Sequence, residues 1–249
     1  MVTQSKQTNP LAQALGRVSL FMLWLWIIWA SAWAWSVDLS PLGIEPRTLS
    51  GLVGVLFAPL VHGSAAHLAG NSIGLLILGT ALWYGYPNSR WWVLGLVWLL
   101  GGIGVWLFAR PSVHFGASGL THGVFFYLFL ISILRRDKRS IALMMIAFFM
   151  FGGMIYSVFP REPGISYESH LAGALVGLAC AVAFRRWDPM PQETRYQWEG
   201  EEDEDDLIGD EWQQGGARSM GAEVLRFPID PETPGRLEQR GPPSSDRRL

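Results

Sequence analysis

Long apolar runs alternate with short polar connections up to about residue 186. Six of these runs approach the ~20 apolar residues that a helix needs to cross a hydrocarbon layer of ~30 Å. They are Val18–Trp35, His67–Tyr86, Trp91–Ala109, Ser118–Leu134, Ser140–Phe159 and Tyr167–Phe184. The pattern therefore predicts an all-α membrane protein with a bundle of six transmembrane helices.

A seventh apolar run, residues 49–61, is too short to span the bilayer and contains Gly51, Gly54 and Pro59. We expect it to lie in the membrane interface or to dip part-way into the bilayer. The first run is long and rich in tryptophan, and no small-residue cleavage site accompanies it. We therefore interpret it as a retained helix and not as a signal peptide.

Charge divides the chain into a basic part and an acidic part. Residues 1–187 hold 12 of the 19 Lys and Arg but only 5 of the 21 Asp and Glu, so their net charge is about +7. The remaining residues have a net charge of about −9. The acidic part is also rich in proline and poor in aliphatic residues, which is typical of disorder. We divide the chain into an N-terminal segment (1–17), a membrane domain (18–186) and a disordered tail (187–249).

The short loops predict the orientation of the bundle, because Lys and Arg favour the cytoplasmic side of a membrane. Nine of them fall on one side, in the N-terminal segment, at residue 90, within residues 135–139 and at residues 185 and 186. The opposite side has only Arg47, Arg110 and Arg161. Both termini are therefore expected in the cytoplasm.

Two polar residues stand at the outer ends of predicted spans, where polar side chains are costly and are functional candidates. Ser118 lies in Gly116-Ala117-Ser118-Gly119 at the start of the fourth span, and His170 opens the sixth. Taken alone, such a serine is more simply a helix N-cap. The same helix end, however, offers unpaired backbone N–H groups that can stabilise an oxyanion. We therefore predict that Ser118 is a nucleophile and His170 its general base.

Glycines indicate how these two residues could meet. Gly173 and Gly177 form a stripe below His170, and Gly119 with Gly123 forms another below Ser118. Small residues at this spacing let two membrane helices approach closely. Contact between the stripes would bring the serine and the histidine within hydrogen-bonding reach.

No acidic residue of the spans is placed to orient His170, because Glu168 falls on a different helical face. We therefore expect a Ser-His dyad that depends on oxyanion donors. His67 and Asn71 are four residues apart and share a helical face. Together with the Ser118 backbone they are the donors that we predict, although an isolated Asn in a membrane helix also serves as a hydrogen bond between helices.

These motifs resemble those of bacterial rhomboid intramembrane serine proteases of the six-helix type. The matching parts are residues 62–71 (HGSAAHLAGN), 116–119 (GASG) and 170–177 (HLAGALVG), in the family's order and on its second, fourth and sixth helices. The resemblance covers about residues 18–186. It implies that Ser118 is the nucleophile, that His170 is the base, and that His67 and Asn71 join the oxyanion hole. It also implies that residues 36–61 form the family's membrane-embedded first loop.

The resemblance implies an intramembrane serine endopeptidase of a bacterial inner membrane that cleaves transmembrane segments near the outer face. Its partners would be single-span or other transmembrane substrates and the lipid bilayer, with no nucleic acid and at most a weak homodimer. The alternative is a rhomboid-like protein that binds membrane clients without cutting them. Inactive relatives are expected to lack the nucleophile or the base, and this chain has both.

His122 departs from the pattern of the family. It lies one helical turn below Ser118, where family members often place an aromatic residue that packs on the catalytic histidine. A stacked histidine would fill the same place, and packing is favoured for His122 over a role as a second base.

Metal binding is the rival chemistry, since all five histidines lie in or beside the outward halves of the spans. They are His62, His67, His114, His122 and His170. There is no His-Glu-x-x-His, no second cysteine and no carboxylate at a ligand spacing within the spans. We expect neither a metal nor a cofactor.

Overall fold

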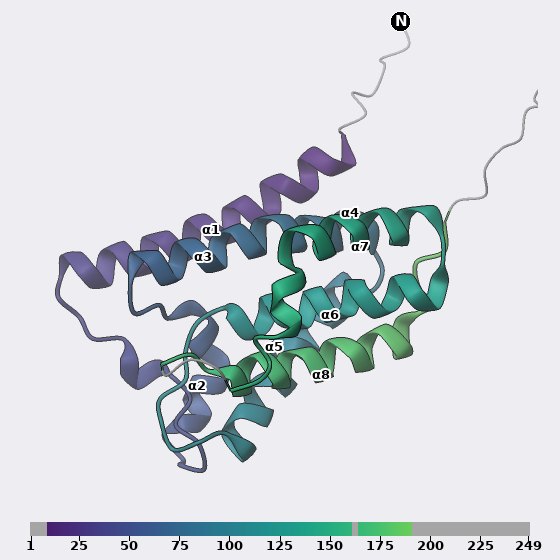
Figure 1. Ribbon diagram of the computed structural model, residues 1–249. Coiled ribbons are helices and arrows are strands. Elements are labelled where there is room, and N and C mark those ends of the chain that lie inside the picture. The colour runs from purple at the N-terminus through teal and green to yellow at the C-terminus, as the bar shows by residue number, and fades with distance from the viewer. Residues whose placement is uncertain (1–8, 161–163, 191–249) are drawn as a thin grey trace, which may run out of the picture. The chain divides into compact units, whose positions relative to one another are not determined.

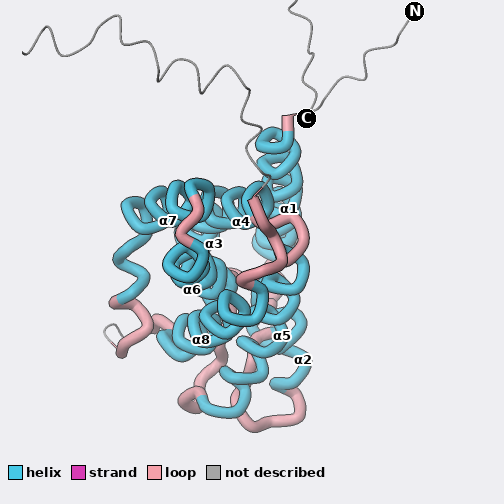
Figure 2. The backbone as a smooth tube through the Cα atoms, turned by 90° about the vertical axis from the view of Figure 1, so that its right-hand side faces the viewer, coloured by secondary structure: helices cyan, strands magenta, loops and turns pink. Residues whose placement is uncertain are grey.

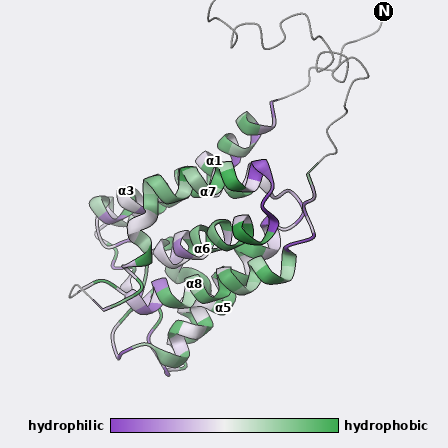
Figure 3. Cartoon of the chain, turned by 45° about the vertical axis from the view of Figure 1, so that its right-hand side comes forward, coloured by the Kyte–Doolittle hydropathy of each residue, from purple (hydrophilic) through white to green (hydrophobic). Residues whose placement is uncertain are grey.

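The computed structural model describes residues 9–160 and 164–190, and this part of the chain is a bundle of helices (Figure 1). Six of its helices are long and apolar enough to cross a membrane, which confirms the predicted fold class. They span Pro10–Ala34, Ala65–Gly85, Arg90–Phe108, Ser118–Arg135, Lys138–Ile155 and Tyr167–Phe184. Apolar residues cover these helices, and hydrophilic residues gather at their ends and in the loops (Figure 3).

The first helix is longer than its apolar run. Helix α1 (Pro10–Ala34) begins at Pro10, whereas the sequence predicted a start at Val18. The Asn9 side chain accepts a hydrogen bond from the Leu11 N–H at 2.9 Å, and proline is well suited to the first helical position. The helix therefore extends N-terminally beyond the apolar run, because it starts at capping residues that hydropathy does not detect.

The second span is not one regular helix. It consists of α3 (Ala65–Gly74), a π-helical turn (Leu75–Gly79) and α4 (Thr80–Gly85). The Ser64 side chain caps α3 by accepting a hydrogen bond from the His67 N–H. Because π turns insert an extra residue into a helix, the residues after Gly79 face directions that an ideal helix would not predict.

The fifth span also changes its geometry. Helix α7 (Lys138–Phe151) is followed by a 3₁₀ turn at Gly152–Ile155 and by further turns up to Phe159. The sequence predicted one helix from Ser140 to Phe159. Two consecutive glycines at 152 and 153 end the α-helix, since glycine is a poor helix former.

Helix α6 (Ser118–Arg135) lies inside the bundle, with α3, α5 (Arg90–Phe108), α7 and α8 (Tyr167–Phe184) around it (Figure 2). It packs most closely on α8 (Tyr167–Phe184) through the glycine stripes. A Cβ atom at Gly173 would overlap the carbonyl of Gly119, and one at Gly177 would overlap that of Gly123. Within a bilayer such close packing drives helix association, because lipid supplies no hydrophobic force between helices. The predicted contact between the stripes is confirmed.

Residues 36–61 fold into a compact loop against α5 (Arg90–Phe108). The loop contains the short helix α2 (Gly51–Phe57) and a 3₁₀ turn at Ala58–Leu60, which are together too short to span a membrane. The Arg47 guanidinium donates to the Ala109 carbonyl at 2.8 Å, and the Trp106 indole N–H donates to the Thr48 carbonyl at 2.8 Å. An isolated antiparallel bridge joins Ile44 to the segment before α6. The loop is thereby held beside the start of α6.

The residues that follow α8 are packed and do not yet belong to a separate tail. Asp188 is 2% exposed, and its carboxylate accepts hydrogen bonds from the Asn88 N–H at 2.7 Å and the Ser89 hydroxyl at 2.6 Å. The Trp187 ring contacts that of Trp92. The tail was expected from residue 187, so its first two residues differ from the expectation. The prediction of disorder for residues 191–249 concerns a part of the chain that lies outside the described residues.

Candidate active site

Ser118 is the first residue of α6, and its hydroxyl lies 3.0 Å from Nε2 of His170. Ala117 occupies the N-cap position, and no side chain caps this helix. The interpretation of Ser118 as an N-cap is therefore wrong: its hydroxyl is directed at the histidine and leaves the first backbone N–H groups uncapped. The two residues are 52 apart in sequence and are brought together by the glycine contact of α6 with α8.

The hydrogen bonds of His170 define its tautomer. Nδ1 lies 3.0 Å from the backbone carbonyl of Ser157. Because a carbonyl oxygen only accepts, Nδ1 must carry the proton, and Nε2 is then free to accept the hydroxyl proton of Ser118. A general base requires this arrangement. The Ser157 carbonyl therefore orients the His170 ring, a role for which the sequence offered no acidic residue.

The His122 ring lies flat against the His170 ring. Their centroids are 3.8 Å apart and their planes differ by 7°. Nδ1 of His122 is 2.6 Å from the Ser118 carbonyl, and Nε2 is 2.6 Å from the Ser157 hydroxyl. Both nitrogens of His122 are thus engaged away from the Ser118 hydroxyl, which agrees with the predicted packing position.

Ser157 connects both imidazoles and was missed by the sequence analysis. Its carbonyl accepts from His170, and its hydroxyl contacts His122. It lies in the turn after the 3₁₀ segment Gly152–Ile155. Nothing in the local sequence marks it, since only the tertiary path of this turn brings Ser157 over the two rings.

His67 and Asn71 lie beside Gly116, two residues before Ser118. A Cβ atom at Gly116 would come within 2.8 Å of His67 Nε2 and 3.6 Å of Asn71 Nδ2. Gly116 has a φ of 112°, a conformation that favours glycine. The position therefore needs glycine twice over: for its backbone angle and for the room that His67 and Asn71 occupy.

The Asn71 amide is an unpaired donor. The residue is only 7% exposed, and its Nδ2 atom is buried without a hydrogen-bond partner among the described residues. A buried polar group without a partner is unusual and requires an explanation. It also shows that the alternative for Asn71, a hydrogen bond from this amide nitrogen to another helix, is absent from the described residues.

His62 belongs to the site and was assigned no role from the sequence. Its Nε2 accepts a hydrogen bond of 3.4 Å from the Ala117 N–H, and its ring meets that of His67 edge to face at 5.1 Å. Burial, together with a smaller effect of the nearby His67, lowers the pKa of His62 to about 4. A neutral imidazole is needed here, because a protonated Nε2 could not accept from Ala117.

The nearest acidic residue serves another partner. The Glu168 carboxylate lies 3.4 Å from Nε of Arg110. It does not hydrogen-bond to His170, as its helical face predicted. Among the residues that the structure describes, a serine and a histidine thus lie together with no carboxylate hydrogen-bonded to the histidine.

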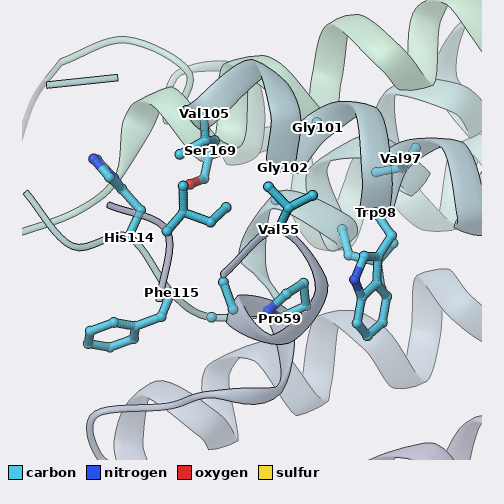
Figure 4. Close-up of a pocket in the computed structure, with 16 residues that line it drawn as sticks. Val55, Pro59, Val97, Trp98, Gly101, Gly102, Val105, His114, Phe115 and Ser169 are labelled. Atoms are coloured by element: carbon cyan, nitrogen blue, oxygen red, sulfur yellow. The ribbon is translucent and has the colours of Figure 1, made fainter. Parts of the chain in front are cut away.

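A small pocket of about 40 Å³ opens next to the dyad, between α2, α5 and the starts of α6 and α8 (Figure 4). Val55 and Pro59 line it from the first loop, and Gly101 and Val105 line it from α5. Gly119, which directly follows Ser118, and Ser169, which directly precedes His170, also line it. Most of the lining residues are apolar or glycine and the volume is small, so the pocket suits a small side chain placed near the serine.

In residues 9–160 and 164–190 no group of three or more His, Cys, Asp or Glu side chains is arranged to hold a metal ion. His114, the remaining histidine, hydrogen-bonds to residues outside the dyad. Its Nδ1 is 2.6 Å from the Ser166 hydroxyl at the start of α8.

The chemistry that the arrangement of Ser118 and His170 favours is nucleophilic attack by a serine with an adjacent base and nearby N–H donors.

Comparison with known proteins gives a family model and several relatives. The model described as the Rhomboid domain matches residues 50–187, more than half of the chain. Uncharacterized proteins of Mycobacterium tuberculosis and Mycobacterium bovis are 34% identical over 148 residues, which is 56% of this chain and 62% of theirs. An uncharacterized protein of Mycobacterium leprae is 34% identical over 149 residues, 59% of its length. The match thus spans about three-fifths of these relatives.

Proposed function

The chain belongs to the rhomboid family of intramembrane proteases, and on that premise we propose that it is a serine endopeptidase that uses Ser118 and His170 as a dyad. Members of this family are usually serine proteases, and the chain is a multi-pass membrane protein. The observation that carries the proposal is the 3.0 Å approach of the Ser118 hydroxyl to Nε2 of His170. The Ser157 carbonyl supports it by holding the proton on Nδ1.

The first half of the reaction transfers an acyl group to Ser118. The hydroxyl oxygen attacks the carbonyl carbon of the scissile peptide bond while its proton moves to Nε2 of His170. A tetrahedral oxyanion forms, and when it collapses the C–N bond breaks. His170 returns the proton to the leaving nitrogen, and the acyl-enzyme remains.

The second half regenerates the serine. A water molecule attacks the acyl carbon and gives a proton to Nε2, and the ester bond to Ser118 breaks. His170 then protonates the serine oxygen, and the new carboxylic acid is released. Each half passes through one oxyanion, so the same donors stabilise both.

The oxyanion donors that we propose are the Ser118 backbone N–H, the Asn71 amide and His67. The Asn71 Nδ2 atom supports this assignment, since it is buried, unpartnered and adjacent to Gly116. In serine proteases of other folds one such donor contributes roughly 3 to 4 kcal/mol to transition-state stabilisation. An amide can supply this without placing a fixed charge in the membrane.

The substrates that we propose are single-span or other transmembrane proteins, cut near the outer face of a bacterial inner membrane, with both termini of the protease in the cytoplasm. A transmembrane helix protects its peptide bonds by hydrogen bonding and by its side chains. Local unwinding must therefore precede attack by Ser118. The non-catalytic alternative of binding or escorting clients would not require a serine and a histidine at bonding distance.

The test is cleavage of a model single-span substrate by the full chain in proteoliposomes. Ser118→Ala should abolish cleavage. Ser132→Ala is the matched control, because Ser132 lies on the same helix and its hydroxyl bonds only the local Phe129 carbonyl. Equal cleavage by Ser118→Ala and wild type would refute the proposal.

A further inference from the structure

A second, much larger cavity lies between α1, the second span and α5. Its volume is about 820 Å³, within the range of roughly 300 to 1,000 Å³ that is common for ligand pockets. Its lining is mostly apolar and includes Leu20, Phe21 and Trp24 from α1 and Leu94 and Leu99 from α5. We refer to it as the α1–α5 groove.

Two arginines stand at one end of the α1–α5 groove. Arg17 and Arg90 both line it, and their guanidinium carbons lie 5.7 and 4.8 Å from the centre of the Trp83 ring. Two like charges that share one indole repel each other unless an anion lies nearby. Among the described residues neither arginine forms a salt bridge, and the Nε atom of Arg90 is buried without a hydrogen-bond partner.

The acidic group that acts electrostatically on Arg90 already has other hydrogen-bond partners. Asp188 attracts Arg90 electrostatically, but its carboxylate accepts hydrogen bonds from two N–H groups and one hydroxyl of Asn88 and Ser89. The guanidinium pair therefore retains capacity for a further anion. Arg17 lies in the N-terminal half of α1 and Arg90 is the first residue of α5, so one anion would bridge two helices.

The apolar part of the groove matches a hydrocarbon chain attached to that anion. Gly79 and Gly95 remove side chains from the walls, and a Cβ atom at Gly95 would meet nothing within 4 Å. The groove extends as far as Trp98 and Leu120, which also line the small pocket beside the dyad. A ligand with an anionic head and a long apolar tail would satisfy both parts at once.

We propose that the α1–α5 groove binds an anionic phospholipid, with the phosphate between Arg17 and Arg90 and an acyl chain along Leu94 and Gly95. Basic pockets between transmembrane helices recognise anionic headgroups in this way. Tryptophans at the same level, Trp83 and Trp91, are typical of residues that lie at the headgroups. Since α1 buries only Ala14, Val18 and Leu25, such a lipid would add contacts that hold α1 to the bundle.

The test uses native mass spectrometry of the full chain in detergent, titrated with dioleoyl phosphatidylglycerol or dioleoyl phosphatidylcholine. Wild type should retain one phosphatidylglycerol and show a higher unfolding midpoint with it than with phosphatidylcholine. Arg17→Gln should weaken retention about fivefold, and Arg17→Gln with Arg90→Gln about 30-fold. Arg185→Gln with Arg186→Gln removes two exposed arginines that do not line the groove and should leave retention unchanged.

A second variant tests the apolar part without altering charge. Gly95→Leu places a side chain in open space within the groove and should abolish retention, whereas Gly16→Leu, at an equally open position that does not line the groove, should not. Equal retention of both lipids, or full retention by Gly95→Leu, would overturn the proposal. Cross-linking from Leu20→Cys to another membrane helix would also overturn the proposal if phosphatidylglycerol did not lower the yield of the cross-link. A helix, and not a lipid, would then fill the groove.

Discussion

The rings of His122 and His170 lie face to face, 3.8 Å apart between centroids, and both are tied to Ser157. One polar residue after the fifth span thereby positions the proposed base twice, by its carbonyl and through a stacked neighbour. Within the described residues, His170 is held on three sides: by Ser118, by Ser157 and by His122. A base held in this way needs no acidic partner to fix its tautomer.

His122→Phe should keep proteolytic turnover within about tenfold of wild type, because a phenyl ring preserves the stacked surface. His122→Ala should lower turnover by about 100-fold, since a displacement of the base by about 1 Å is enough for such a loss. The measurement is kcat for cleavage of a model substrate in proteoliposomes. If His122→Phe were as inactive as His170→Ala, His122 would have a role in proton transfer and the packing assignment would be wrong.

Asn71→Ala should lower kcat by about 10² to 10³ and leave the unfolding midpoint unchanged. The reason is that Nδ2 has no partner in the resting structure, so its removal breaks no hydrogen bond from that atom. Ser72→Ala is the matched control. The Ser72 hydroxyl donates to the Leu68 carbonyl and accepts from the Trp26 indole, so its loss should reduce stability and spare kcat. A large stability loss in Asn71→Ala would instead assign Asn71 to packing.

Gly177→Ala should destabilise the bundle by about 1 to 3 kcal/mol, as overpacking commonly does. A methyl group there overlaps the Gly123 carbonyl, and the backbone of α6 must move. Gly16→Ala, in a helix but with nothing within 4 Å, should be neutral or slightly stabilising. The free energy of unfolding in mixed detergent micelles distinguishes them, and equal values for the two variants would contradict the close contact of α6 with α8.

His62 should make stability depend on pH. Its pKa is about 4 in the folded chain against an ordinary 6.5, so between these values the unfolded chain binds a proton that the folded chain does not. The free energy of unfolding should fall as the pH drops from 6.5 towards 4, and no further loss should come from this residue below that. His62→Gln retains an acceptor for the Ala117 N–H and should show a smaller fall over this window. Parallel pH curves for the two proteins would show that His62 is not responsible.

Much of the bundle could be predicted from hydropathy, because a bilayer requires long apolar helices whatever their partners. The bounds of α8 agree with the prediction at both ends, and the glycine stripes predicted its contact with α6. The start of α1, the π turn in the second span and the 3₁₀ turn after α7 were not predicted. These features depend on caps and on local packing, which a hydropathy pattern does not record.

The dyad was predictable because Ser118 and His170 both lie at the outer ends of predicted spans. The glycine stripes below them then predicted how the two residues meet. Ser157 and His62 were missed because their contacts use a carbonyl oxygen and a backbone N–H across long sequence separations. Any residue could supply that carbonyl, so no side-chain pattern marks it.

The most direct test of the account is covalent labelling of the full chain with a fluorophosphonate, followed by mass spectrometry of the modified peptide. The reaction requires a serine activated by an adjacent base. The account predicts one adduct on Ser118, lost in Ser118→Ala, strongly reduced in His170→Ala and unchanged in Ser132→Ala. An adduct on another serine, or labelling of Ser118 that is as fast in His170→Ala as in wild type, would contradict the proposed dyad.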